Sequence, residues 1–170
     1  MLSFLLAPLF VQTKAFENQS KALTNAKMIG IATEMYLADH KDRYPAVRDT
    51  EHFKQAVAPY LQSSKVWISL NPKGGGLCFA LNLAGVNEAV PEIPGDIPLL
   101  YDSKPWPDGK RIVTFADGHT DFVKSQDWPA IERRLKTKYS RRALKEPSAK
   151  EIQEFRKQHS GVKSLPPSLP

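Results

Sequence analysis

The feature that most limits the possible folds is a proline-free stretch from about Gln12 to His40, in which Gly30 is the only glycine. Its apolar and small residues recur at helical spacing and predict one helix of roughly 40 Å. Between Gln12 and Leu23 only Phe16 interrupts polar or small residues. We therefore expect only the C-terminal half of this helix to pack on the rest of the chain, and the N-terminal half to protrude. The predicted packing stripe consists of Ala22, Ala26, Ile29, Thr33, Tyr36 and Leu37.

The first residues, Met1 to Val11, are apolar apart from Ser3 and are interrupted by Pro8. This segment is shorter than the about 20 residues that a membrane-spanning helix needs. It also lacks the charged start and the small-residue cleavage site of a signal peptide. Two interpretations stay open: the end of a longer apolar segment that begins upstream of Met1, or a short apolar cap on the following helix.

A β-hairpin is predicted where Asp117-Gly118 separates two apolar runs. Asp-Gly is a preferred pair for a two-residue type I′ turn, in which both residues have positive φ. That turn would place Phe115 opposite Thr120 and Val113 opposite Phe122. Val113, Phe115 and Phe122 would then share the core face of the sheet.

The remaining apolar runs predict short elements. Thr50 is the expected N-cap of a second helix, which carries Phe53 and Val57 at helical spacing. Strands are predicted at 66–68, 77–83 and 99–102, and a short helix is predicted around Trp128, Ile131 and Leu135. The fold class is therefore α+β, with a long N-terminal helix packed on a small antiparallel sheet.

The positive charge of the chain is concentrated near its C-terminus. The 170 residues carry a net charge of +6, and residues 133–163 alone hold eleven Lys or Arg against three Glu. Ser148 to Glu151 has the form of a capping box and opens a basic helical extension, while Ser164 to Pro170 is expected to be unstructured. We expect three parts: residues 1–41 (apolar start and long helix), 42–137 (globular head) and 138–170 (basic, partly disordered tail).

Four segments resemble the bacterial type IV pilin-like proteins, or pseudopilins, and in particular the prepilin-type processing-associated proteins. They are Leu5 to Gln12, Asn25 to Tyr36 with Tyr44-Pro45, Ala58 to Trp67, and Phe115-Ala116-Asp117-Gly118-His119. Their order and spacing match the family's N-terminal helix, helix end, second helix and C-terminal motif. The family's defining His falls at Pro107 here, its Gly-Phe-Thr-Leu-Ile-Glu type cleavage site is missing, and Ala22 and Ser69 stand where many members carry Cys.

The resemblance implies a non-enzymatic structural protein of the bacterial cell envelope, either single-pass in the inner membrane or extracytoplasmic. Its implied partners are pilin-like subunits or the assembly proteins of a type IV pilus or type II secretion system, reached through the N-terminal helix. It implies no cofactor. Its structural motif residues are Tyr44, Pro45, Asp117, Gly118 and His119. Residues 1–11 would provide membrane contact.

Two alternatives come from the residues themselves. Asp117, His119 and Asp121, with Asp102 as a further candidate, have the side chains of a metal-binding or hydrolytic site, although no second motif accompanies them. The basic tail could instead bind anionic surfaces such as nucleic acid, lipid or polysaccharide without specificity. The single cysteine, Cys78, lies in an apolar run and is expected to be a buried, inert thiol.

Overall fold

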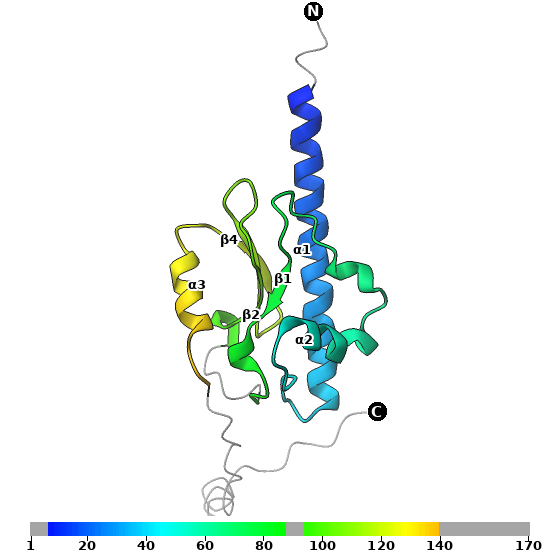
Figure 1. The fold of residues 1–170 in the computed structure, drawn as a ribbon, viewed down its shortest axis with the longest axis vertical. Coiled ribbons are helices and arrows are strands. Elements are labelled where there is room, and N and C mark those ends of the chain that lie inside the picture. The colour runs from blue at the N-terminus through cyan, green and yellow to red at the C-terminus, as the bar shows by residue number, and fades with distance from the viewer. Residues whose placement is uncertain (1–6, 88–93, 140–170) are drawn as a thin grey trace, which may run out of the picture.

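The computed structural model describes residues 7–87 and 94–139, and the side chains from Lys14 onward. Helix α1 (Ala7–Asp39) is 33 residues long, which corresponds to about 50 Å. It is followed by α2 (Thr50–Val57), which continues into the 3-10 helix η1 (Ala58–Tyr60). The C-terminal half of α1 lies beside the sheet and its N-terminal half projects beyond it (Figure 1).

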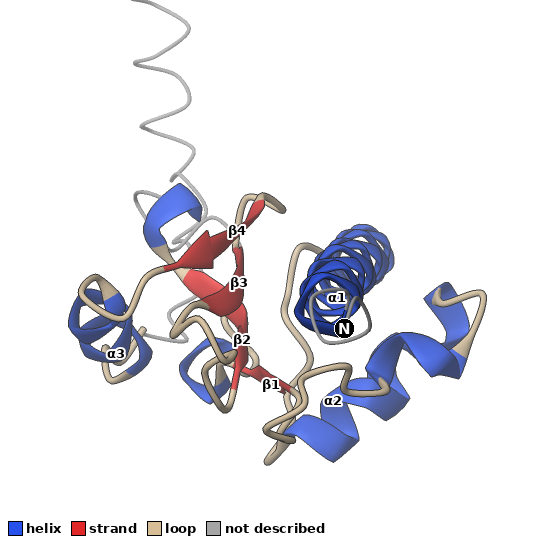
Figure 2. Cartoon of the chain, turned by 90° about the horizontal axis from the view of Figure 1, so that it is seen from above, coloured by secondary structure: helices blue, strands red, loops and turns tan. Residues whose placement is uncertain are grey.

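A four-stranded antiparallel sheet follows in the chain, which confirms the α+β class. Its strands are β1 (Leu77–Phe79), β2 (Pro98–Asp102), β3 (Arg111–Phe115) and β4 (Thr120–Val123), in the spatial order β1-β2-β3-β4. Helix α3 (Trp128–Leu135) packs on the sheet face opposite α1, so the sheet lies between two helices (Figure 2). Both faces of the sheet are therefore covered.

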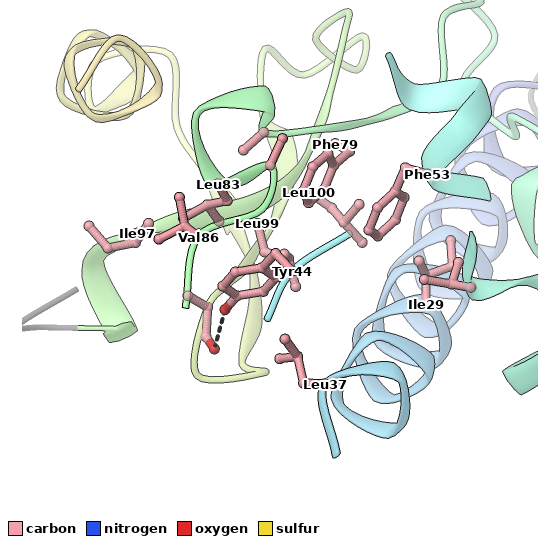
Figure 3. Packing of buried hydrophobic residues seen from close by; sticks show 14 of the residues in the cluster. Ile29, Leu37, Tyr44, Phe53, Phe79, Leu83, Val86, Ile97, Leu99 and Leu100 are labelled. Atoms are coloured by element: carbon pink, nitrogen blue, oxygen red, sulfur yellow. Dashed lines mark hydrogen bonds between the residues drawn. The ribbon is translucent and has the colours of Figure 1, made fainter. Parts of the chain in front are cut away.

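The main core lies between α1, α2 and the sheet (Figure 3). Phe53 of α2 stacks on Phe79 of β1 with ring centroids 4.1 Å apart. The predicted stripe of α1 is confirmed, because Ala26, Ile29, Thr33 and Leu37 are fully buried. On the other face, Val113 and Phe115 pack against Ile131 of α3.

The predicted hairpin register is wrong by one residue. Phe122 lies opposite Ile112 instead of Val113, and both pack toward α1. Val113 and Phe115 point to the other face, toward α3. The prediction assumed one apolar face, whereas the two helices bury both faces of β3. A shift of one residue then exchanges the faces without exposing an apolar strand.

Three local predictions are also corrected. Residues 66–68 do not form a strand, since Ser64–Trp67 is the 3-10 helix η2. The strand predicted over 77–83 ends at Phe79, and Leu81–Leu83 forms the 3-10 helix η3. Asp49, not Thr50, caps α2: its carboxylate accepts the backbone N–H of His52 at 2.9 Å. The Thr50 hydroxyl accepts the N–H of Phe79 instead, which ties α2 to the edge of β1.

Candidate functional site

The hydrogen-bonded pair Phe115–His119 closes a loop of three residues, Ala116 to Gly118, so the predicted two-residue type I′ turn is wrong. The Phe115 N–H donates to the His119 carbonyl at 2.8 Å, and the Gly118 N–H donates to the Phe115 carbonyl at 3.0 Å. Gly118 has φ +83°, whereas Asp117 is not among the residues with positive φ. This is the geometry of a type I turn closed by a left-handed glycine. The turn therefore requires the backbone conformation of a glycine only at position 118, and it uses Asp117 for the hydrogen bonds of its side chain.

Asp117 and His119 form a local pair at this turn. The Asp117 carboxylate accepts the backbone N–H of His119 at 3.1 Å and lies 2.5 Å from its ring Nδ1. Partial burial raises the pKa of Asp117, but the hydrogen bonds from His119 outweigh it and hold that pKa below its ordinary value. The imidazole stacks on Phe115 with centroids 4.2 Å apart. These contacts bind the turn to itself.

Asp121 makes a different contact. Its carboxylate accepts the N–H of the next residue, Phe122, at 2.6 Å. Phe115 donates its N–H to the His119 carbonyl, so these two residues face each other at a hydrogen-bonded position. Because such positions alternate along an antiparallel pair, the Phe122 N–H points away from β3, toward the open edge. The Asp121 side chain therefore occupies a donor on an edge strand, which is a common way to blunt such an edge.

The residues of the predicted metal cluster do not converge. Within residues 7–87 and 94–139, no group of three His, Cys, Asp or Glu side chains is placed to hold a metal ion. His119 and Asp121 both line a shallow groove beside α3, together with Asp127 and Arg134. Arg134 is already engaged with Asp96, whose carboxylate lies 3.0 Å away.

Pro98, the first residue of β2, pairs with Phe115 beside the turn, whereas Asp102 is the last residue of that strand. Asp102 is therefore separate from the turn. It is buried and accepts two hydrogen bonds, from the Trp106 indole at 2.8 Å and from the Ile112 N–H at 2.9 Å. Burial raises its pKa above the ordinary value, although those two hydrogen bonds and Arg111 oppose the rise. Asp102 thus anchors the loop between β2 and β3.

The structure brings Tyr44 and the hairpin turn together, which the sequence spacing could not show. Tyr44 is buried, and its hydroxyl donates to the Ala116 carbonyl at 3.5 Å (Figure 3). The Ala116 N–H donates to the Ile97 carbonyl at 2.8 Å. Pro45 accepts the N–H of Gly85 through its carbonyl at 3.2 Å. The Tyr44-Pro45 pair and the Asp117-Gly118 turn therefore form one connected structural unit at the end of α1.

Gly30 is a residue whose role the sequence pattern did not identify. A Cβ at this position would lie 3.1 Å from the Thr114 side chain on β3, a tight contact. The absence of a side chain lets α1 approach the sheet closely. Its being the only glycine in the long helical stretch was the available signal.

The free part of α1 is the other candidate site. Among the side chains described from Lys14 onward, Gln19 is the first to form a hydrogen bond with the head: its amide donates to Asp108 at 3.2 Å. Before that point Phe16 is 75% exposed. Among the helices that the structure describes, none is both long and apolar enough to cross a bilayer.

No protein-family model, curated protein or solved structure matches this chain.

Proposed function

We propose that this chain is a non-enzymatic, pilin-like structural protein of the bacterial cell envelope, of the pseudopilin kind, that assembles through its N-terminal helix. The observation that supports it best is the division of α1 into two halves. The C-terminal half buries Ala26, Ile29 and Leu37 against the head, and the N-terminal half projects beyond the sheet with Phe16 exposed (Figure 1).

The motif residues support the same proposal. The Tyr44 hydroxyl, which donates to the Ala116 carbonyl, joins the chain just after the long helix to the turn of the last hairpin. His119 donates its backbone N–H to Asp117 within the turn. In this role the motif holds a head domain on a helix, and the helix is left to make contacts with neighbouring subunits or with a membrane. Helix association there would bury apolar surface such as Phe16.

Cross-linking in bacterial cells that make a type IV pilus or type II secretion system tests this function. In a Cys78→Ser background, Phe16→Cys labelled with a thiol-linked photo-cross-linker should give cross-linked products with pilin-like subunits, because residue 16 lies on the projecting half of α1. Leu81→Cys is the matched control, since Leu81 is an exposed apolar residue on the head, 49% exposed. Equal cross-linking of both variants, or products with Leu81→Cys alone, would contradict assembly through the helix.

A further inference from the structure

An exposed apolar seam runs along α1 on the side away from the sheet. Met28, Ile31 and Met35 are 42%, 62% and 49% exposed. With the exposed residues Thr24 and Ala38 they form a series spaced by four, three, four and three residues. This is the a/d spacing of a heptad repeat. We call Thr24, Met28, Ile31, Met35 and Ala38 the α1 seam.

The α1 seam lies opposite the buried side of the same helix. Ala26 and Thr33, both fully buried, occupy the heptad position farthest from a and d. Seen from above, the sheet and α2 lie on two sides of α1 and leave another side open (Figure 2). Within the described residues the helix therefore has one face that packs on its own sheet and a second apolar face in solvent.

A seam with this period is complementary to another helix, because a and d residues at 3.5-residue spacing insert between the side chains of a facing helix. Methionine side chains adapt easily to such a surface. The backbone of α1 is already held in place by its own sheet. Association would therefore not need to order this helix, which lowers the entropic cost of binding.

We propose that the α1 seam pairs with the same seam of a second copy of this chain, in antiparallel orientation. Charge complementarity selects the partner and its direction. Lys21 occupies the next a position before the seam and pairs with Glu17, at the d position before it, so a parallel pair would place Lys21 opposite Lys21 and Glu17 opposite Glu17. An antiparallel pair places Lys21 beside Ala38 and Asp39 of the second copy, at the negative end of that helix.

The flanking charges agree with this direction. Lys27 and Glu34 occupy the same heptad position on one side of the seam. Two helices that run antiparallel bring this position of one copy next to the same position of the other. Lys27 then lies on the same side of the pair as Glu34 of the second copy, whose Oε1 is buried in its own chain, and this juxtaposition occurs twice by symmetry. Met28 packs on Ile31 of the second copy at the centre, and Thr24 packs on Met35 of the second copy farther out.

The antiparallel pair goes beyond the proposed function and does not rest on it. It uses residues 24–38, whereas the proposed assembly uses the projecting half of α1. The two projecting halves point in opposite directions in such a pair. Two copies paired in this way cannot place both N-terminal segments in one side-by-side bundle, so pairing and assembly exclude each other for the copies involved.

Sedimentation of the full chain over a range of concentrations tests the pairing. Ile31→Glu should weaken self-association by about tenfold or more, because it places a charge at the centre of a desolvated seam. Ile68→Glu is the matched control: Ile68 is 61% exposed, as Ile31 is 62%, but lies off the helix. It should leave self-association essentially unchanged. A chain that stays monomeric at millimolar concentration, or equal effects of the two variants, would overturn the pairing.

Disulfide trapping tests the direction, in a Cys78→Ser background. A mixture of Thr24→Cys and Met35→Cys proteins should form mixed dimers, whereas neither protein alone should cross-link efficiently. Rapid cross-linking of Thr24→Cys with itself would indicate a parallel pair and overturn the proposal.

The thermal unfolding midpoint at low protein concentration tests whether another segment of the same chain, and not a second copy, covers the α1 seam. A large decrease for Ile31→Glu compared with Ile68→Glu would show that another segment of the same chain covers the seam, and would also overturn the proposal.

Discussion

At the scale of single residues, this protein is shaped by side chains and glycines that act on the backbone. Gly30 allows α1 to approach β3, and Gly118 adopts the positive φ that closes the last turn. The Asp117 carboxylate accepts a hydrogen bond from the His119 N–H, and the Asp102 carboxylate accepts one from the Ile112 N–H. Each polar residue here satisfies a backbone donor, so the chain uses its carboxylates to fix loops and strand ends.

Gly30→Val should lower the free energy of unfolding by about 1–3 kcal/mol, because the added side chain meets Thr114 where helix and strand are packed tightly. Denaturant unfolding measures the change. Valine has a higher helix propensity than glycine, so a loss of stability in this variant comes from packing and not from the helix itself. An unchanged or higher free energy of unfolding would show that the close approach at residue 30 carries no packing cost.

Asp102 should make the stability of the native protein fall as the pH rises. Its folded-state pKa lies above the ordinary value of 3.8 because the carboxyl is buried. The native state therefore holds the proton more tightly than the unfolded chain. Its stabilising effect is complete below pH 3.8 and is lost as the pH rises through the folded-state pKa. Asp102→Asn keeps an oxygen acceptor but cannot titrate.

Denaturant unfolding at a series of pH values measures this effect as the difference between Asp102→Asn and the native chain. The difference should move in favour of the variant as the pH rises. Asp117 acts in the opposite sense, since its lowered pKa contributes stability that is lost as the pH falls. Asp117 is present in both proteins and cancels in the comparison. A difference that does not depend on pH would rule out the assignment to Asp102.

At the scale of elements, α1 combines two environments in one continuous helix. From about Gln19 onward it contacts the head, and its C-terminal half buries Ile29 and Leu37. Short isolated helices are marginal in water, and most helix stability in proteins comes from packing. The two halves of α1 should therefore differ in stability although they form one element.

Hydrogen exchange should show strong protection from Ile29 to Leu37 and weak protection before Lys21. The reason is that only the C-terminal half of α1 is held by the sheet, so that half opens only together with the head. Peptide-level mass spectrometry at low protein concentration, where self-association is minimal, is the measurement. Uniform protection along α1 would show that its N-terminal half has a packing partner.

At the scale of the whole molecule, α1 and α3 cover the two faces of one sheet. Asn82 donates its side-chain amide to the Arg134 and Thr137 carbonyls, and this closes the C-terminal end of α3. Tyr139 packs against the main core. The predicted basic extension from Ser140 to Pro170 lies outside the described residues.

Deleting residues 140–170 should leave the thermal unfolding midpoint almost unchanged, because the described core is complete at Tyr139. Deleting residues 128–170 should lower it strongly, since that removes α3 from Val113 and Phe115. The shorter deletion should also weaken binding to a polyanion column at low salt, because it removes seven of the eleven Lys and Arg residues in the basic region 133–163. A large decrease in the midpoint for the shorter deletion would place the domain boundary later in the chain.

The sequence alone was enough to predict the elements in which the spacing of apolar residues fits only one kind of secondary structure. The stripe of α1, the strand at 99–102 and the helix around Ile131 have one buried side each or a clear spacing, and the structure confirms them. The α+β class follows from these elements. The pairing of Tyr44 with the last hairpin was not predictable, because a contact between residues this far apart in the chain leaves no periodic pattern.

Only the tertiary structure decided the hairpin register. Asp117-Gly118 is compatible with a two-residue loop and with a three-residue loop, which differ by one residue in pairing. Alternation could not choose between them, because Ile112 and Val113 are both buried, one facing α1 and the other α3. In the structure Ala116 is held in the loop by hydrogen bonds to Ile97 and Tyr44. Long-range contacts selected the register, because two helices made either face of β3 acceptable to apolar side chains.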